Sequence, residues 1–191
     1  MAGNSHLKKV GILGLQGCIT PHIAHIEKLG AQAVIVRNRE ELMETERMIL
    51  PGGESTTMLK LLKITGLDSA LIEYGQNKPL WGICAGAILI SKEVSHPKQE
   101  SLGLIDIHAK RNHYGSQLDS FEGELDTTIF DSPIKVQFIR APLLSPLNDT
   151  VKVLSHSGSD AVLMRQNRIL VSAFHTELGE DSRLHSYFLS I

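Results

Sequence analysis

The chain has 191 residues, of which 42% are hydrophobic, so it can bury a sizeable core within a single domain. Its 19 basic and 21 acidic residues give a formal net charge of -2, which argues against a nucleic-acid-binding protein and against an anionic membrane surface as a partner. The two cysteines, Cys18 and Cys84, are too few for a disulfide framework and are not spaced like metal ligands, which favours the reducing cytoplasm.

The first half of the sequence alternates short apolar runs with segments of helical periodicity, after a leader at residues 1–6 that we expect to be disordered. No apolar run approaches the ~18 residues of a membrane helix. We expect Ser55 or Thr56 to cap the second helix. The predicted strands are 10–15, 33–36, 48–50 and 79–83, and the predicted helices are 19–29, 56–64, 67–74 and a helix that begins at residue 85.

The second half lacks full helical crossovers between its strands. The predicted strands are 104–109, 134–139, 151–154, 161–164 and 169–174, followed by a last helix at 182–189. We therefore predict a single α/β domain, residues 1–191, with a mainly parallel sheet flanked by helices and an added antiparallel part.

Cys84 stands in the pattern Gly82-Ile83-Cys84-Ala85-Gly86, between a buried strand and a helix. A G-x-S-x-G version of this pattern presents the nucleophile of α/β hydrolases on a sharp turn. The helix N-terminus favours a thiolate, and the N–H of Ala85 would face a developing oxyanion. The alternative is a buried structural cysteine in a tight turn, which is the role that we expect for Cys18.

His175 is the candidate base, because it follows the strand 169–174, and Glu177 two residues later can orient it. A solvent-facing His-x-Glu pair is the alternative. His22 and His25 could pair on a metal, but no third ligand is evident, and His185 is expected to lie on the face of the last helix. His113 falls in a segment that could approach the site.

Gly52 and Gly53 follow the third predicted strand, where a glycine pair lets the backbone expose N–H groups. Gly53 is the candidate second oxyanion donor beside Ala85. The phosphate-loop pattern is absent. A plain turn between strand and helix is the alternative.

The chain resembles the class I, triad-type glutamine amidotransferases, which have a flavodoxin-like fold. Within them it is similar to the glutaminase subunits of pyridoxal 5'-phosphate synthases. The matching stretches span the chain: GLQG at 14–17, LPGGESTTM at 50–58, GICAG at 82–86, RN at 111–112, YG at 114–115, QLDSFE at 117–122, FIRAP at 138–142, and FH at 174–175 with EL at 177–178.

The resemblance implies roles for individual residues. It makes Cys84, His175 and Glu177 the catalytic triad and Arg111 the partner of the substrate's α-carboxylate. The remaining glutamine-binding residues that it implies are Gly53, Glu54, Ser55, Ile139 and Arg140. Two positions depart from the family pattern: Thr176 replaces a proline, and Ser116 replaces an arginine.

The implied activity is hydrolysis of L-glutamine to L-glutamate and ammonia, with no metal or cofactor. The implied partner is the (β/α)₈ synthase subunit, which would use the ammonia to make pyridoxal 5'-phosphate and would dock near Gln16. The hypotheses left open are a subunit of another synthase, such as that of imidazole glycerol phosphate, a cysteine peptidase on a similar fold, and a non-catalytic binding module.

Overall fold

The computed structural model describes residues 7–111 and 120–191 of the chain. The expected leader at 1–6 and the motif residues 112–119, which include His113 and Ser116, lie outside the described residues.

The first half of the chain forms parallel strands joined by helices, as the alternating pattern predicts. All four predicted strands and four predicted helices of this half are confirmed. The elements are β1 (Lys9–Leu13), α1 (Thr20–Lys28), β2 (Gln32–Val36), α2 (Arg39–Met43), β3 (Arg47–Leu50), α3 (Ser55–Thr65), α4 (Leu67–Asn77), β4 (Leu80–Ile83) and α5 (Ala85–Ile90).

The second half is mostly strand. Its elements are β5 (Ser91–Ser95), β6 (Ile105–Lys110), β7 (Phe121–Leu125), β8 (Ile134–Phe138), β9 (Leu143–Pro146), β10 (Lys152–Ser157), β11 (Asp160–Gln166), β12 (Ile169–Ser172) and α6 (Arg183–Ser190). The short elements α2, β5, β7 and β9 were not predicted.

One large sheet runs in the order β2-β1-β3-β4-β12-β11-β9-β6-β5, with β10 paired to β11. Along this order, β2, β1, β3, β4 and β12 are parallel to one another. The next strand, β11, pairs with β12 in antiparallel orientation. A separate antiparallel sheet consists of β7 and β8. The prediction of a mainly parallel sheet with an added antiparallel part is therefore confirmed.

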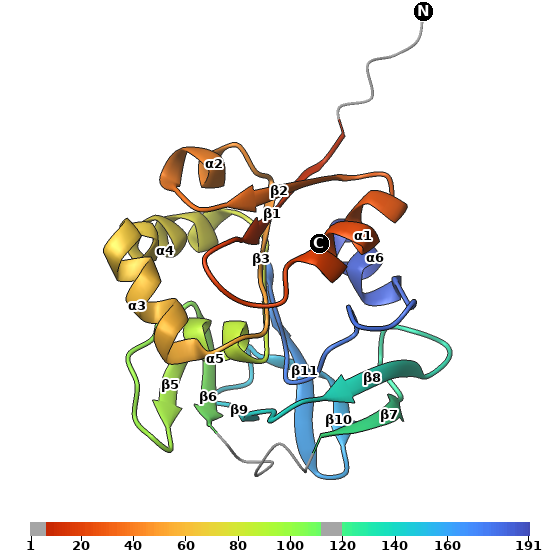
Figure 1. Cartoon of the computed structure of the whole chain (residues 1–191). Coiled ribbons are helices and arrows are strands. Elements are labelled where there is room, and N and C mark those ends of the chain that lie inside the picture. The colour runs from red at the N-terminus through yellow and green to blue at the C-terminus, as the bar shows by residue number, and fades with distance from the viewer. Residues whose placement is uncertain (1–6, 112–119) are drawn as a thin grey trace, which may run out of the picture.

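Helices cover both faces of the parallel half: α1 and α6 lie on one side, and α3, α4 and α5 lie on the other (Figure 1). This arrangement explains why β3, β4 and β12 are buried along their whole length and read as continuous apolar runs. The carboxyl ends of these three neighbouring strands therefore meet at one protected edge.

The cap of α3 differs from the prediction. Glu54, and not Ser55 or Thr56, is the N-cap, and its carboxylate accepts hydrogen bonds from the N–H groups of Thr56 at 3.0 Å and Thr57 at 2.6 Å. Glutamate is an uncommon N-cap, and the sequence favoured the commoner serine or threonine.

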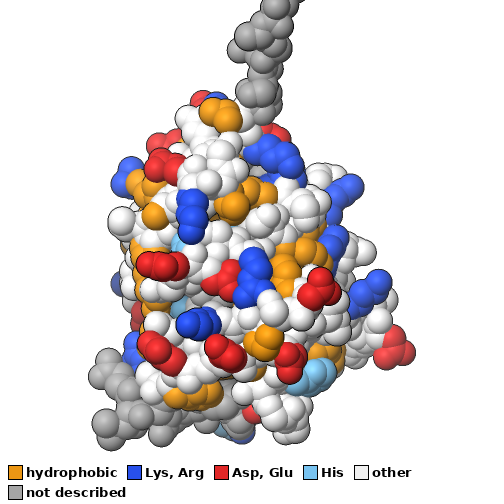
Figure 2. Space-filling view, turned by 90° about the vertical axis from the view of Figure 1, so that its right-hand side faces the viewer, with side chains coloured by type: hydrophobic (Ala, Val, Ile, Leu, Met, Phe, Trp, Pro, Cys, Tyr) orange, Lys and Arg blue, Asp and Glu red, His pale blue; other side chains and the backbone are white. Residues whose placement is uncertain are grey.

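The face that carries α1 and α6 mixes acidic and basic side chains, and neither sign forms a continuous field on it (Figure 2). Within the part of the chain that the structure describes, none of the helices has the length and apolar character needed to span a membrane.

Candidate active site

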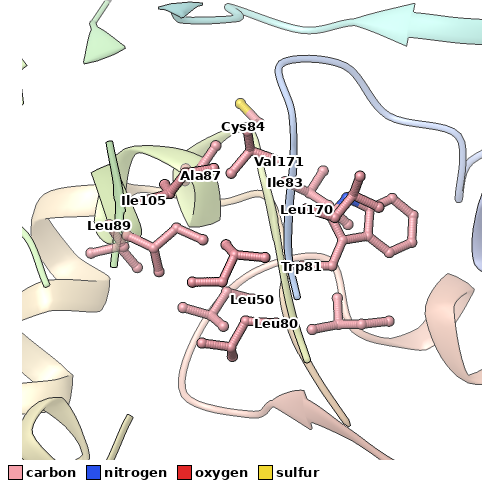
Figure 3. Close-up of a cluster of buried hydrophobic side chains, with 14 of the residues drawn as sticks. Leu50, Leu80, Trp81, Ile83, Cys84, Ala87, Leu89, Ile105, Leu170 and Val171 are labelled. Atoms are coloured by element: carbon pink, nitrogen blue, oxygen red, sulfur yellow. The ribbon is translucent and has the colours of Figure 1, made fainter. Parts of the chain in front are cut away.

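Cys84 lies on the turn between β4 and α5, in a backbone conformation that non-glycine residues rarely adopt (φ 50°, ψ -103°). Its backbone N–H donates to the carbonyl of Ser172 on β12 at 2.8 Å. Figure 3 shows the sulfur at the end of the buried cluster, directed away from the apolar side chains. The strained turn therefore presents the thiol at the edge of the sheet.

The two flanking glycines are required by close backbone approaches. A Cβ at Gly82 would lie 2.7 Å from the carbonyl oxygen of Gly86, and a Cβ at Gly86 would lie 2.0 Å from that of Leu50. Both contacts are too short for any side chain, which confirms that the pattern G-x-C-x-G marks a chain that doubles back tightly.

His175 follows β12, the neighbour of β4, and its ring is almost fully buried. Its Nδ1–H donates to Oε1 of Glu177 over 2.6 Å, because an ionised carboxylate can only accept. The predicted contact is confirmed, although the chain does not continue extended: a turn closed by the N–H of Gly179 and the carbonyl of Thr176 follows at once.

The backbone of His175 is held by a second element. Its N–H donates to the carbonyl of Gln137 at 2.8 Å, and the N–H of Gln137 donates back at 2.9 Å. The small β7–β8 sheet is thereby joined to the candidate base. Nothing in the sequence around Gln137 indicated this pairing, since it links positions far apart in the chain.

Burial and hydrogen bonding shift the pKa values of His175 and Glu177 in opposite directions. Burial alone would lower the pKa of His175, but hydrogen bonds with Cys84 and Glu177 outweigh it and raise that pKa well above its ordinary value. Burial would raise the pKa of Glu177, but the hydrogen bond from His175 and the neighbouring imidazoles lower it. Each group therefore stabilises the charged form of the other, so an imidazolium that forms when His175 takes up a proton lies next to a carboxylate.

The loop between β3 and α3 lies against the ring of His175 and against the side chain of Gln16. A Cβ at Gly52 would be 2.3 Å from Cε1 of His175, so the ring packs directly on that glycine. Oε1 of Gln16 accepts the N–H of Glu54 at 2.9 Å and lies over Gly53, where a Cβ would be 2.5 Å from it. Gln16 therefore covers the loop that carries the predicted oxyanion donor Gly53.

A cavity of about 90 Å³ opens at Cys84. It is lined by Gly53, Glu54, Ser55, Cys84, Ala85, Ile88, Arg111, Ile139 and Arg140. All the residues that the sequence predicted to bind substrate or to form an oxyanion hole are among them, and Ile88 is the addition. The volume is well below the roughly 300–1,000 Å³ of ligand pockets.

Three contacts narrow this cavity. Arg111 donates from Nη2 to Oε1 of Glu54 across 3.4 Å, so the two predicted substrate partners bind each other. The thiol of Cys84 donates to the carbonyl of Ile139 at 3.8 Å. Ser55 donates to Oε1 of Gln99 at 3.0 Å, a partner that the sequence did not indicate. A substrate would have to replace at least the first two.

A larger cavity, about 400 Å³, lies on the other side of His175 and is lined by that residue with Thr176, Gly179 and residues of β7 and β8. Its lining includes neither Cys84 nor Arg111, so it does not offer the thiol of the candidate nucleophile.

Comparison with known proteins places the chain. A model of the SNO glutamine amidotransferase family matches residues 12–191. The chain belongs to this family. The pyridoxal 5'-phosphate synthase subunit PdxT of Solibacter usitatus is 48% identical to the chain over 190 residues. The match covers 96% of this chain and 99% of that protein. A PdxT of Thermosipho africanus is 44% identical over 184 residues, covering 96% and 98%.

A crystal structure of a glutamine amidotransferase shares 40% identity with the chain and superposes with a TM-score of 0.88, covering 95% of this chain and 97% of the other. The family match begins within β1 and continues through the last residue, so every candidate site residue lies inside it.

Proposed function

We propose that this chain is the glutaminase subunit of a pyridoxal 5'-phosphate synthase and that it hydrolyses L-glutamine to L-glutamate and ammonia. The observation that carries the proposal is the buried 2.6 Å bond between His175 and Glu177, next to a cysteine on a strained turn, in a member of the SNO glutamine amidotransferase family.

The first half of the reaction acylates Cys84. The thiol gives its proton to His175, and the thiolate attacks the carbon of the side-chain amide of glutamine. The N–H groups of Gly53 and Ala85 stabilise the oxyanion. Collapse of the tetrahedral intermediate breaks the C–N bond, and the proton held by His175 goes to the leaving nitrogen, which departs as ammonia.

The second half releases glutamate. Water attacks the thioester while His175 accepts its proton, and the C–S bond breaks to return the thiol. Glu177 accepts the Nδ1–H of His175 throughout, so that Nε2 is the nitrogen available for proton transfer.

Binding of glutamine relies on charge complementarity. Arg111 would exchange the carboxylate of Glu54 for the α-carboxylate of the substrate, and Glu54 would turn to its ammonium group. Ser55, Arg140 and the carbonyl of Ile139, which line the same cavity, complete the contacts.

The proposed partner is the (β/α)₈ synthase subunit, and the proposed place of action is the cytoplasm. Free ammonia becomes ammonium in water at neutral pH and loses its nucleophilicity, which gives a reason for direct transfer between docked subunits. The narrow cavity and the contact between Gln16 and the loop at Gly53 support a site that opens when the partner docks near Gln16.

The test is glutamate release from L-glutamine, measured with and without the synthase subunit. We expect low release alone and strong stimulation by the partner, abolished by Cys84→Ala. Cys18→Ala is the matched control, because it removes the other thiol and should leave the rate unchanged. If glutamate does not appear with the partner present, the proposal is wrong; stimulation by a different synthase alone would reassign the pathway.

A further inference from the structure

Three histidines lie together behind the Glu177 carboxylate, and the mechanism above uses none of them. His22 and His25 come from α1 and His185 from α6, and all three are buried. The rings of His25 and His185 stack with centroids 4.3 Å apart, and His22 meets the edge of Trp81 at 6.1 Å. Burying three imidazoles is costly unless their nitrogens are paired.

His22 connects the cluster to the candidate triad. Its Nδ1 lies 2.9 Å from Nε2 of His185, and its Nε2 lies 3.7 Å from Oε1 of Glu177, the same oxygen that accepts from His175. The side chains of His22 and Glu177 have no exposed surface. Within the described residues, Nε2 of His22 and Oε2 of Glu177 are both buried without a hydrogen-bond partner.

Burial and geometry together select the protonation state of this pair. Burial lowers the pKa of His22 to about 4 and that of His185 to about 2, so at neutral pH each ring carries one proton. The 2.9 Å contact between them needs one donor and one acceptor, which leaves two arrangements of the protons.

In the first arrangement, His185 donates from Nε2 to Nδ1 of His22. The proton of His22 is then on Nε2 and faces the carboxylate of Glu177. The unpartnered Nδ1 of His185 is a bare acceptor. In the second arrangement, a lone pair of His22 faces the carboxylate and Nδ1–H of His185 is a buried donor without a partner. The second arrangement loses on both counts, because charge–dipole repulsion and an unsatisfied buried donor each cost free energy.

We propose that His22, fixed in its Nε2–H form by His185, is a positioning residue that directs an N–H dipole at Glu177 and keeps that carboxylate ionised and aimed at His175. The chain would thus extend the triad inward as His185–His22–Glu177–His175–Cys84. This role rests on the proposed glutaminase function, since it acts on the same proton transfer.

Other uses of the cluster fit the contacts less well. A shared metal ion would need converging lone pairs, whereas His25 is engaged through Nδ1 with Ser182 at 2.8 Å and through Nε2 with the carbonyl of Glu177 at 3.2 Å. Within the described residues, no group of three His, Cys, Asp or Glu side chains is arranged to hold a metal. The ionisable groups that face His22 are His25, His185, His175 and Glu177.

The first test does not depend on activity. Ring ¹⁵N NMR of the whole chain should show His22 and His185 as neutral Nε2–H tautomers at pH 7, with signals assigned from His22→Gln and His185→Phe. In His22→Phe, the His175 ring should titrate at a higher pH than in the wild type, because the Glu177 carboxylate has lost a competing donor and stabilises the imidazolium of His175 more strongly. An Nδ1–H tautomer for His22, or an unshifted His175, would overturn the proposal.

The second test uses glutaminase activity with the synthase subunit. His22→Phe should lower kcat at least tenfold with KM within threefold and should shift the pH profile, and His22→Gln should restore most of kcat because its amide can still donate. Phe188→Leu is the matched control: it disturbs the same Trp81, 5.7 Å away, without touching the carboxylate.

If His22→Phe behaves like Phe188→Leu, the cluster is only structural and the proposal is wrong. If His22→Phe does not fold, His185→Phe should show a smaller shift of the same sign, and no shift there is equally decisive against it. A wild type that fails to hydrolyse glutamine would remove the proposed function, whereas the tautomers and the titration of His175 would still judge this inference.

Discussion

Gly52 offers a substitution that should damage catalysis and leave the fold intact. Its backbone is not in the left-handed region, so alanine is tolerated locally. The added Cβ would lie 2.3 Å from Cε1 of His175, and since ordinary contact begins at 3.4 Å, the ring must move by about 1.1 Å. The 400 Å³ cavity that His175 lines leaves space beside the ring, so the fold should persist with a loss of about 1–2 kcal/mol in the free energy of unfolding.

Such a movement should separate His175 from its two hydrogen-bond partners, Cys84 and Glu177. A misplacement of ~1 Å in a reacting geometry costs about 10²-fold in rate, or ~2.7 kcal/mol in activation free energy. We expect that loss in kcat/KM for glutamate release with the synthase subunit. Gly123→Ala is the control, because nothing lies within 4 Å of its Cβ. Gly52→Ala with more than half of wild-type activity would refute the reasoning.

Three further substitutions test other contacts. Gly86→Ala places a Cβ 2.0 Å from the backbone oxygen of Leu50 and should cost about 3 kcal/mol in urea unfolding; a loss under ~1 kcal/mol would contradict the clash. Hydrogen bonds from Thr57 and Thr56 outweigh burial and lower the pKa of Glu54 to about 2 in the folded chain. The ionised Glu54 therefore stabilises the folded state above pH 4.5, and this stabilisation is lost as the pH falls toward 2. Glu54→Gln should therefore flatten the loss of stability between pH 5 and pH 3, by less than ~1 kcal/mol because the side chain is half exposed; an unchanged slope would exclude this role. Arg111→Gln should raise KM for glutamine at least about tenfold with kcat within threefold, as expected for a lost charged hydrogen bond, and an unchanged KM would remove Arg111 from the substrate site.

The parallel half of the fold could be predicted because its signals are local. The strands β1 and β3 are short apolar runs followed by Gly14 and Pro51, and the longer connecting helices show their own periodicity. The elements α2 and β9 were not predicted, because five and four residues are too few to show a periodic pattern. The strands β5 and β7 expose charged side chains, so they do not read as buried runs.

In the candidate site, too, the sequence indicated the residues that form a local pattern and missed the contacts between remote segments. Cys84 and the glycines around it form a pattern within five residues, so the sequence alone indicated them. The contacts of His175 with Gln137, of Ser55 with Gln99 and of His22 with Glu177 join segments that are remote in sequence, and no local pattern records them. His22 had only one local signal, its spacing of three from His25 on a helix whose apolar face turns inward.

The glycines nevertheless carry long-range information, because each marks a place where another segment comes too close for a side chain. Gly86 is pressed by Leu50 of β3, and Gly52 is pressed by the ring of His175 after β12. These two contacts tie the ends of β3, β4 and β12 to one another at the edge where Cys84 lies. A substitution at either glycine therefore tests the assembly of the site itself, and the two should differ. An added Cβ against the fixed backbone of Leu50 at Gly86 costs mainly stability, whereas an added Cβ against the movable ring of His175 at Gly52 costs mainly activity.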